Sequence, residues 1–230
     1  MNSINLDTIR INMVGSNFLS ASEDCCVYLI SNNQSSILID TGAGLSKSIV
    51  RISQNIAKIE PKENIKYIVV THAHIDHVGG LKAIKSHLPN SKVIAHEYAA
   101  RVILEEDSIL SAANWYRTKL QSVHIDIIIK NFFELQLLGG KFQIIPCPGH
   151  TPGSIIGFIN SEVTGECVVF GQDIHGPFMP EWLSDISQWR RCMRKILSLR
   201  PDYLCEGHFG IIKGKNDVRH FIEKYLKQFS

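Results

Sequence analysis

Three histidines and one aspartate fall within six consecutive residues, in the run HAHIDH that spans His72 to His77. The apolar residues 67–70 are typical of a buried strand, and a helix is expected to begin within residues 78–81. Alternate side chains of an extended segment share a face, so His72 and His74 are expected to bind one ion together. Asp76 and His77 lie past the strand end and are free to serve a neighbouring ion. Because borderline metals such as zinc suit mixed imidazole and carboxylate ligands, the run predicts a metal centre.

The pattern His-x-His-x-Asp-His resembles the metallo-β-lactamase superfamily of metallohydrolases, and later stretches are similar to the family in the expected order. The family's early aspartate, in a strand-to-glycine turn, resembles Asp40 in ILIDTG. Its third metal histidine resembles His150 in PGHTPGS, a stretch similar to the glyoxalase and lactonase branches. Its bridging carboxylate resembles Asp173 in FGQD, and its last histidine resembles His208 in EGHFG. The resemblance therefore extends over nearly the whole chain.

The resemblance implies a complete set of ligands for two divalent ions per chain, with zinc the expected metal and iron or manganese the alternatives. One ion would be held by His72, His74 and His150, the other by Asp76, His77 and His208, and both by a bridging Asp173. Two ions about 3.5–4 Å apart share a hydroxide, because metal binding lowers the pKa of water from about 15.7 towards about 7. Asp76 is also the catalytic candidate, because it can orient this hydroxide or carry its proton.

Several assignments have alternatives. Asp40 is expected to accept a hydrogen bond from a ligand histidine and so fix its tautomer, but a capping or turn role competes. Gln172 stands where relatives often have glycine before the bridging aspartate, so Glu166 and Asp185 are alternatives to Asp173. The histidines without a motif are interpreted as structural: His87, His96, His124, His175 and His220.

The segment 174–183 directly follows Asp173 and is rich in aromatic residues and proline. Loops with aromatic residues beside a catalytic group often set specificity. Phe178 and Trp182 are therefore expected to contact substrate. His175 is the third candidate for substrate binding because it lies in the same segment.

The composition fits a compact enzyme with a small-molecule substrate. The 230 residues are 44% hydrophobic, enough for a sizeable core, and the net charge of +2 gives no basic groove for nucleic acid. No signal pattern opens the chain and no apolar stretch approaches the ~20 residues of a membrane span, so a cytoplasmic protein that does not bind membranes is expected. The six cysteines lack the spacing of a disulfide framework and are interpreted as reduced core residues.

Strand-like runs and amphipathic segments alternate in two series. The strands are expected at residues 26–31, 36–40, 67–71, 92–95, 133–138, 141–147, 154–160, 167–170 and 203–205, and helices around 45–56, 78–88, 189–197 and 218–229. Two mixed sheets packed face to face with helices outside follow from this order. The fold class is α/β (α+β), and the arrangement is the αββα sandwich that the resemblance implies, with the metals at one edge between the sheets.

A single domain over residues 1–230 is expected, with a helical insertion around 97–130. Residues 99–120 are expected to be helical, and Trp115 and Tyr116 form an aromatic pair within them. Packing of this segment against the sandwich is favoured over a lid, because aromatic pairs at helical spacing usually belong to a core. A subunit contact, as in a homodimer, is the remaining alternative.

The expected function is the hydrolysis of small ester-like substrates, with a lactone or thioester preferred over a phosphodiester. Relatives in the glyoxalase II branch carry a helical domain after the last ligand, whereas 22 residues follow His208 here. The main alternative is an iron-dependent oxygenase similar to persulfide dioxygenases, which keep the histidine at position 74. Phosphodiesterase activity and a non-catalytic metal-binding module are further alternatives.

Overall fold

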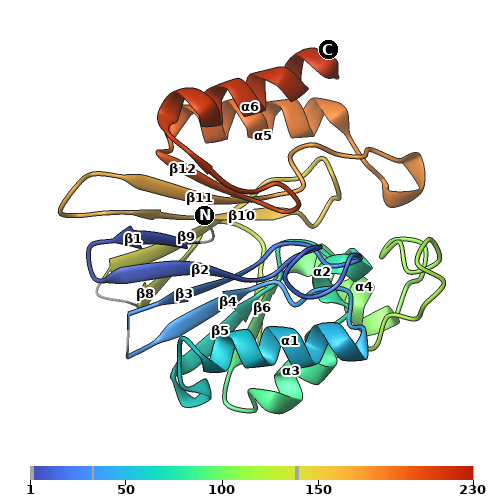
Figure 1. Ribbon diagram of the computed structural model, residues 1–230. Helices are drawn as coiled ribbons and strands as arrows, with labels where there is room; N and C mark the ends of the chain where they lie inside the picture. Colours follow the sequence, from blue (N-terminus) through green and yellow to red (C-terminus); the bar gives the residue numbers. More distant parts are fainter. Residues whose placement is uncertain (1–2, 33, 138–139, 230) are drawn as a thin grey trace.

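Two β-sheets lie face to face between two layers of helices in the computed structural model, which describes residues 3–32, 34–137 and 140–229 (Figure 1). The first sheet has the order β1 (Ser3–Leu6), β2 (Ile9–Gly15), β3 (Val27–Ser31), β4 (Ser36–Ile39), β5 (Ile65–Val69), β6 (Lys92–His96) and β7 (Ile127–Ile129). It is antiparallel from β1 to β4 and parallel from β4 to β7. The sheet is therefore mixed, as the sequence predicts.

The second sheet has the order β13 (Gly210–Lys213), β12 (Tyr203–Glu206), β11 (Cys167–Gln172), β10 (Ile155–Asn160), β9 (Gly140–Pro146) and β8 (Phe133–Leu137). Its strands are antiparallel except for the parallel pair β11 and β12. The strand expected at 133–138 is present to Leu137, and residue 138 lies outside the described residues.

Helices cover both outer faces of this sandwich. Helices α1 (Ser46–Ala57) and α3 (Leu81–His87) lie over the first sheet, and α5 (Ile186–Ser198) and α6 (Lys215–Gln228) lie over the second (Figure 1). Shorter elements are α2 (Ile75–Val78), α4 (Glu97–Glu105) and the 3-10 helices η1 (Lys62–Asn64) and η2 (Pro180–Trp182). The predicted αββα sandwich is confirmed.

The inner strands are apolar on both faces because each face packs against a different layer. In β3, Val27 and Leu29 belong to the core beneath the helices of the first sheet, whereas Tyr28 and Ile30 face the second sheet. This alternation is the period of two expected of a strand. Tyr28 and Phe170 meet edge to face between the sheets at 5.9 Å. Burial of both strand faces explains why these runs are almost continuously hydrophobic.

Segment 97–130 differs from the prediction. Helix α4 ends at Glu105 because Glu106 adopts a left-handed conformation, and turns without helix follow. Ala113 and Leu120 are buried as expected, but Trp115 and Tyr116 are 49% and 41% exposed. The aromatic pair is therefore not part of the core, and the prediction of a helix through residue 120 is wrong.

The cysteines also differ from the prediction. Cys147, directly after β9, forms a disulfide with Cys192 of α5, and their Cα atoms are 5.3 Å apart. The fold brings together two residues 45 positions apart, a separation that carries no local signal. The remaining four are free and buried: Cys25, Cys26, Cys167 and Cys205. The interpretation of Cys147 and Cys192 as reduced is thus corrected.

None of the helices in the described part of the chain combines the length and apolar character that crossing a membrane requires.

Candidate metal centre

The residues of the predicted ligand set meet at one edge of the sandwich, where most follow the carboxyl end of a strand or lie in a loop, and Asp76 and His77 lie in the short helix α2. His72 and His74 follow β5, Asp173 follows β11 and His208 follows β12. His150 lies in the loop between β9 and β10. Parallel strand ends are where open sheets commonly hold functional groups, which accounts for the convergence of residues far apart in the sequence.

The first cluster contains His72, His74, His150 and Asp173, all buried. One nitrogen or oxygen from each residue lies within 4.8 Å of the others. His150 Nδ1 donates to the carbonyl oxygen of Pro177 at 2.9 Å, which leaves the Nε2 lone pair free. This Nε2 faces His74 Nδ1 at 2.9 Å. Imidazole nitrogens are donors that borderline divalent ions prefer, and these two lie close enough together to bind the same ion.

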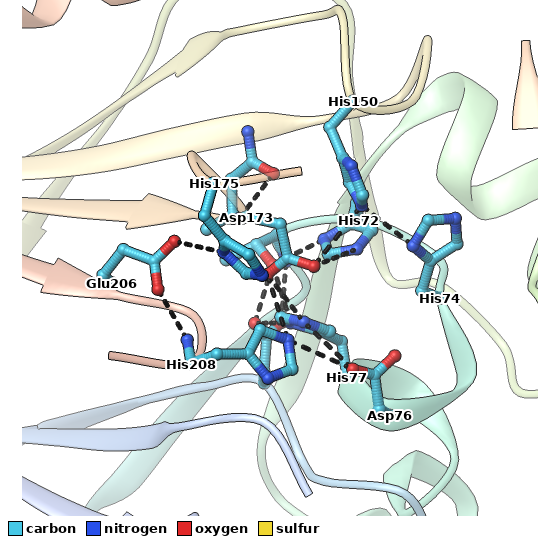
Figure 2. A network of polar contacts seen from close by, with 12 residues as sticks. His72, His74, Asp76, His77, His150, Asp173, His175, Glu206 and His208 are labelled. Carbon is cyan, nitrogen blue, oxygen red and sulfur yellow. Dashed lines mark hydrogen bonds and ion pairs between the residues drawn. The ribbon is translucent and has the colours of Figure 1, made fainter. Parts of the chain in front are cut away.

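The second cluster contains Asp76, His77, Asp173 and His208. Helix α2 begins at Ile75, three residues earlier than expected, so Asp76 and His77 lie on its single turn, and the His77 ring lies 4.1 Å from that of His72 (Figure 2). His208 Nε2 is 3.2 Å from Asp76 Oδ2, and the corresponding His77 nitrogen is 3.7 Å from it. Of these residues, only His208 is appreciably exposed.

Asp173 is shared by the two clusters and lies between them (Figure 2). Its Oδ2 faces the first cluster, 3.4 Å from His150 Nε2 and 3.8 Å from His72 Nε2. Its Oδ1 faces the second, 3.1 Å from His77 Nε2 and 3.3 Å from His208 Nε2. A carboxylate with one oxygen on each side has the orientation required to bridge two ions.

Several of the atoms that face the clusters are buried without a hydrogen-bond partner in the described part of the chain: His72 Nε2, His77 Nε2 and Asp173 Oδ1. Leaving a buried polar atom unpaired costs about 1–3 kcal/mol, and native proteins avoid it. Divalent ions would satisfy lone pairs in both clusters at once. The donor set, all imidazole and carboxylate, therefore fits a pair of borderline metals.

Asp40 lies behind His77 and outside the two clusters. Its Oδ2 accepts from His77 Nδ1 at 2.7 Å, and it also accepts from the backbone amide and hydroxyl of Thr71. Because a carboxylate only accepts, this contact places the hydrogen of His77 on Nδ1 and leaves Nε2 free to face Asp173. Asp40 adopts a left-handed conformation (φ 60°), which turns the chain out of β4 towards this position.

The ionisation of the histidines divides them into the same two groups. Burial lowers the pKa of His72, His74 and His150 below the usual value, so these imidazoles are neutral near pH 7. Burial acts in the same direction on His77 and His208, but neighbouring acidic groups outweigh it. Cys25 and then Asp173, Asp40 and Asp76 raise the pKa of His77 well above its usual range, and Asp173 and Asp76 raise that of His208 to about 10.

The buried carboxylate of Glu206 is a component of the site that the sequence analysis did not identify. Its Oε2 accepts from the backbone amides of His208 and Phe209, at 2.7 and 2.9 Å. Its Oε1 accepts from His175 Nδ1 at 2.9 Å and from the amide of Ile174 at 3.0 Å. Glu206 thereby joins the His208 turn to the segment after Asp173. Its place beside Gly207 and His208 in EGHFG was the available signal.

A cavity of about 140 Å³ opens onto the clusters. Trp182 and His175 line it, as do three residues of segment 97–130: Ala112, Trp115 and Tyr116. Phe178 does not line this cavity and packs instead against Trp189 and Phe229, at ring distances of 5.1 and 4.8 Å. The segment that was expected to pack against the sandwich thus contributes a wall of the site.

The alternative bridging acids lie elsewhere. Glu166 accepts a hydrogen bond from the Tyr203 hydroxyl at 3.1 Å, and Asp185 caps α5 through the amide of Gln188 at 2.9 Å. Neither belongs to the two clusters that surround Asp173. Of the histidines interpreted as structural, only His175 lines the cavity.

Comparison with known proteins agrees with the fold. The solved metallo-beta-lactamase of Cronobacter sakazakii, in a mutant form, superposes with a TM-score of 0.78 at 20% identity, over 100% of this chain and 95% of that one. FEZ-1 metallo-beta-lactamase from Legionella gormanii superposes with a TM-score of 0.78 at 18% identity, over 100% of this chain and 94% of that one. The facing sheets are those of the metallo-beta-lactamase fold, and the paired histidine and aspartate clusters form its candidate metal centre.

A model of the metallo-beta-lactamase superfamily matches residues 23–164, and the chain belongs to this superfamily. It is 26% identical over 206 residues to the Beta-lactamase-like protein 2 homolog of Caenorhabditis elegans, covering 87% of this chain and 61% of the relative. It is 26% identical over 155 residues to hydroxyacylglutathione hydrolase GloC of Haemophilus influenzae, covering 63% of this chain and 64% of the relative. The chain spans about three fifths of the length of these relatives.

Proposed function

We propose that the protein is a hydrolase that uses two divalent metal ions, zinc in the first instance, to cleave small ester-like substrates such as lactones or thioesters. The observation that carries the proposal is the position of Asp173, with one carboxylate oxygen directed to each histidine cluster. The hydroxyacylglutathione hydrolase relatives support a thioester as the substrate class.

The ligand assignments in this proposal follow the two clusters. His72, His74 and His150 would hold one ion, Asp76, His77 and His208 the other, and Asp173 both. Bound there, the ions would supply Lewis acidity and lower the pKa of a water towards about 7, which gives a nucleophile at neutral pH.

The surrounding residues orient the ligands and handle the proton. Asp40 holds the Nε2 lone pair of His77 towards the cluster, and Pro177 does the same for His150. Asp76 lies at the cavity wall, where its carboxylate can accept the proton of the attacking water. Glu206 fixes the turn that presents His208.

Metal content and activity together test the proposal. Untagged protein is expected to contain about two zinc ions per chain and to hydrolyse members of a panel of lactones, thioesters, phosphodiesters and β-lactams. Oxygen consumption on a persulfide measures the alternative. About one iron per chain together with oxygen consumption would identify an oxygenase, and no bound metal would favour a regulatory module.

Acidification is expected to remove the two ions in a defined order. His77 and His208 have raised pKa values, so protons compete with metal for the second cluster throughout the range from pH 8 to pH 6. The lowered pKa values of the other three histidines spare the first cluster over the same range. Zinc stoichiometry measured at fixed free zinc should fall from two to one before it falls further.

The control for this titration is His220→Gln, because His220 is an exposed histidine of α6 outside both clusters. This variant should lose zinc at the same pH values as the parent. Simultaneous loss of both ions, or retention of both at pH 6, would contradict the assignment of the protonated histidines to one cluster.

A further inference from the structure

Two segments from different parts of the chain meet across the mouth of the cavity. One is the 107–118 segment after α4, and the other is the 176–185 segment that contains η2. They extend from the same end of the sandwich (Figure 1). Trp115 Nε1 donates to Glu181 Oε1 at 2.7 Å, and the Trp115 ring lies 4.6 Å from that of Trp182. The Trp182 ring in turn lies 4.4 Å from the imidazole of His74.

Both segments are attached to the backbone that carries the histidines. The carbonyl of Ser111 accepts from the amide of Ile75, next to His74, at 2.8 Å. On the other side, the hydroxyl of Ser184 donates to the carbonyl of His150 at 2.7 Å. These bonds hold the aromatic wall, formed by Trp115 and Trp182, at a fixed distance from the clusters. The space between the wall and the clusters therefore limits the size of the substrate.

The cavity selects substrates by their charge as well as by their size. Its volume of about 140 Å³ is below the ~300 Å³ at the lower end of ordinary ligand pockets. Within the described parts of the chain, neither lysine nor arginine lines it. The carboxylate of Glu181 does not line the cavity but accepts from Trp115, which does. A substrate carboxylate placed beside Trp115 would meet the negative charge of Glu181 rather than a lysine or arginine, and would be repelled there.

We propose that Trp115, held in place by Glu181, is a specificity-determining residue that restricts the site to short, uncharged acyl groups and uncharged leaving groups. This inference rests on the proposed function and refines its substrate class. A thioester of a small neutral thiol is a substrate, whereas a thioester of an anionic thiol such as glutathione is excluded.

Thiol binding to the cobalt-loaded protein tests the inference without turnover, because the thiolate-to-cobalt absorption reports binding directly. The probes are N-acetylcysteamine, which is small and neutral, glutathione, which carries carboxylates, and 2-phenylethanethiol, which is neutral and bulky. The parent should bind N-acetylcysteamine at least about tenfold more tightly than either of the others.

Two variants separate size from charge. Trp115→Ala is expected to strengthen binding of 2-phenylethanethiol by about tenfold relative to N-acetylcysteamine, because it removes the outer wall. Glu181→Gln removes the charge but keeps an oxygen that can accept from Trp115 Nε1, and should strengthen the binding of glutathione without changing that of 2-phenylethanethiol. Phe132→Ala is the matched control, because Phe132 is 57% exposed and does not line the cavity. It should leave all three affinities unchanged.

The outcomes distinguish this inference from the proposed function. The inference is overturned if the cobalt-loaded parent binds the three thiols with equal affinity, or if Trp115→Ala keeps the selectivity of the parent. Either result leaves the hydrolase proposal standing. Selective thiol binding without hydrolysis of any ester supports the inference on size and charge and overturns the hydrolase proposal. A protein that binds no cobalt overturns both.

Discussion

Asp173→Ala is expected to lose at least one metal ion and to reduce turnover by more than the roughly 10–100-fold typical of residues that merely orient a ligand. The expectation follows from the position of this carboxylate, whose oxygens lie within 3.1–3.8 Å of four imidazole nitrogens. Removing it takes a ligand from each cluster at once. Zinc content by mass spectrometry and turnover on the best substrate of the panel measure the effect.

The control for this variant is Asp217→Ala, because Asp217 is an exposed aspartate in the first turn of α6. It should retain both ions and full turnover. Circular dichroism of the metal-free proteins establishes that each variant folds. If Asp173→Ala kept two ions, another acid would have to bridge them, although Glu166 and Asp185 both bond elsewhere in the structure.

Much of the fold follows from local patterns in the sequence. The strands expected at 92–95 and 154–160 correspond to Lys92–His96 and Ile155–Asn160, because runs buried on both faces are visible without tertiary information. The helix expected at 218–229 corresponds to α6, whose apolar stripe buries Val218, Ile222 and Tyr225. The residues of the two clusters were likewise identifiable, because the first motif and the later glycine-rich turns carry them.

Other elements gave weaker signals. The edge strands β1 and β13 have only four residues each, and each pairs across a short turn with the strand beside it in the sequence, β2 and β12 respectively. Strand β2 alternates Ile9, Ile11 and Met13 with polar residues, so this pattern was available but was not interpreted as a strand. Short edge strands are set by tertiary pairing more than by composition.

The walls of the cavity could not be predicted for a different reason. Trp115 reaches the site only because the chain leaves α4 at a left-handed residue, Glu106, and then turns back towards η2. An aromatic residue at helical spacing is ordinarily buried, and the local sequence does not reveal that the helix has already ended. Contacts such as Trp115 with Glu181, 66 positions apart, depend on the assembled fold.

Gly207→Ala is expected to empty the metal centre although it alters no ligand. A β-carbon at residue 207 would lie 2.2 Å from Asp173 Oδ1, closer than real contacts allow, and 3.3 Å from His77 Cε1. The carboxylate must move away, so its bridging orientation is lost. Because the principal clash is with a side chain, the metal-free protein should fold, and its thermal midpoint should change far less than its zinc content.

The matched control is Gly140→Ala at the start of β9, where an added β-carbon meets nothing within 4 Å. Zinc content and turnover of this variant should equal those of the parent. A more disruptive comparison is Gly79→Ala, whose β-carbon would lie 2.2 Å from the backbone oxygen of Ala43. Backbone cannot retreat as a side chain can, so this variant should lose stability together with metal. If Gly207→Ala bound two zinc ions with unchanged affinity, the carboxylate of Asp173 would not occupy the bridging position.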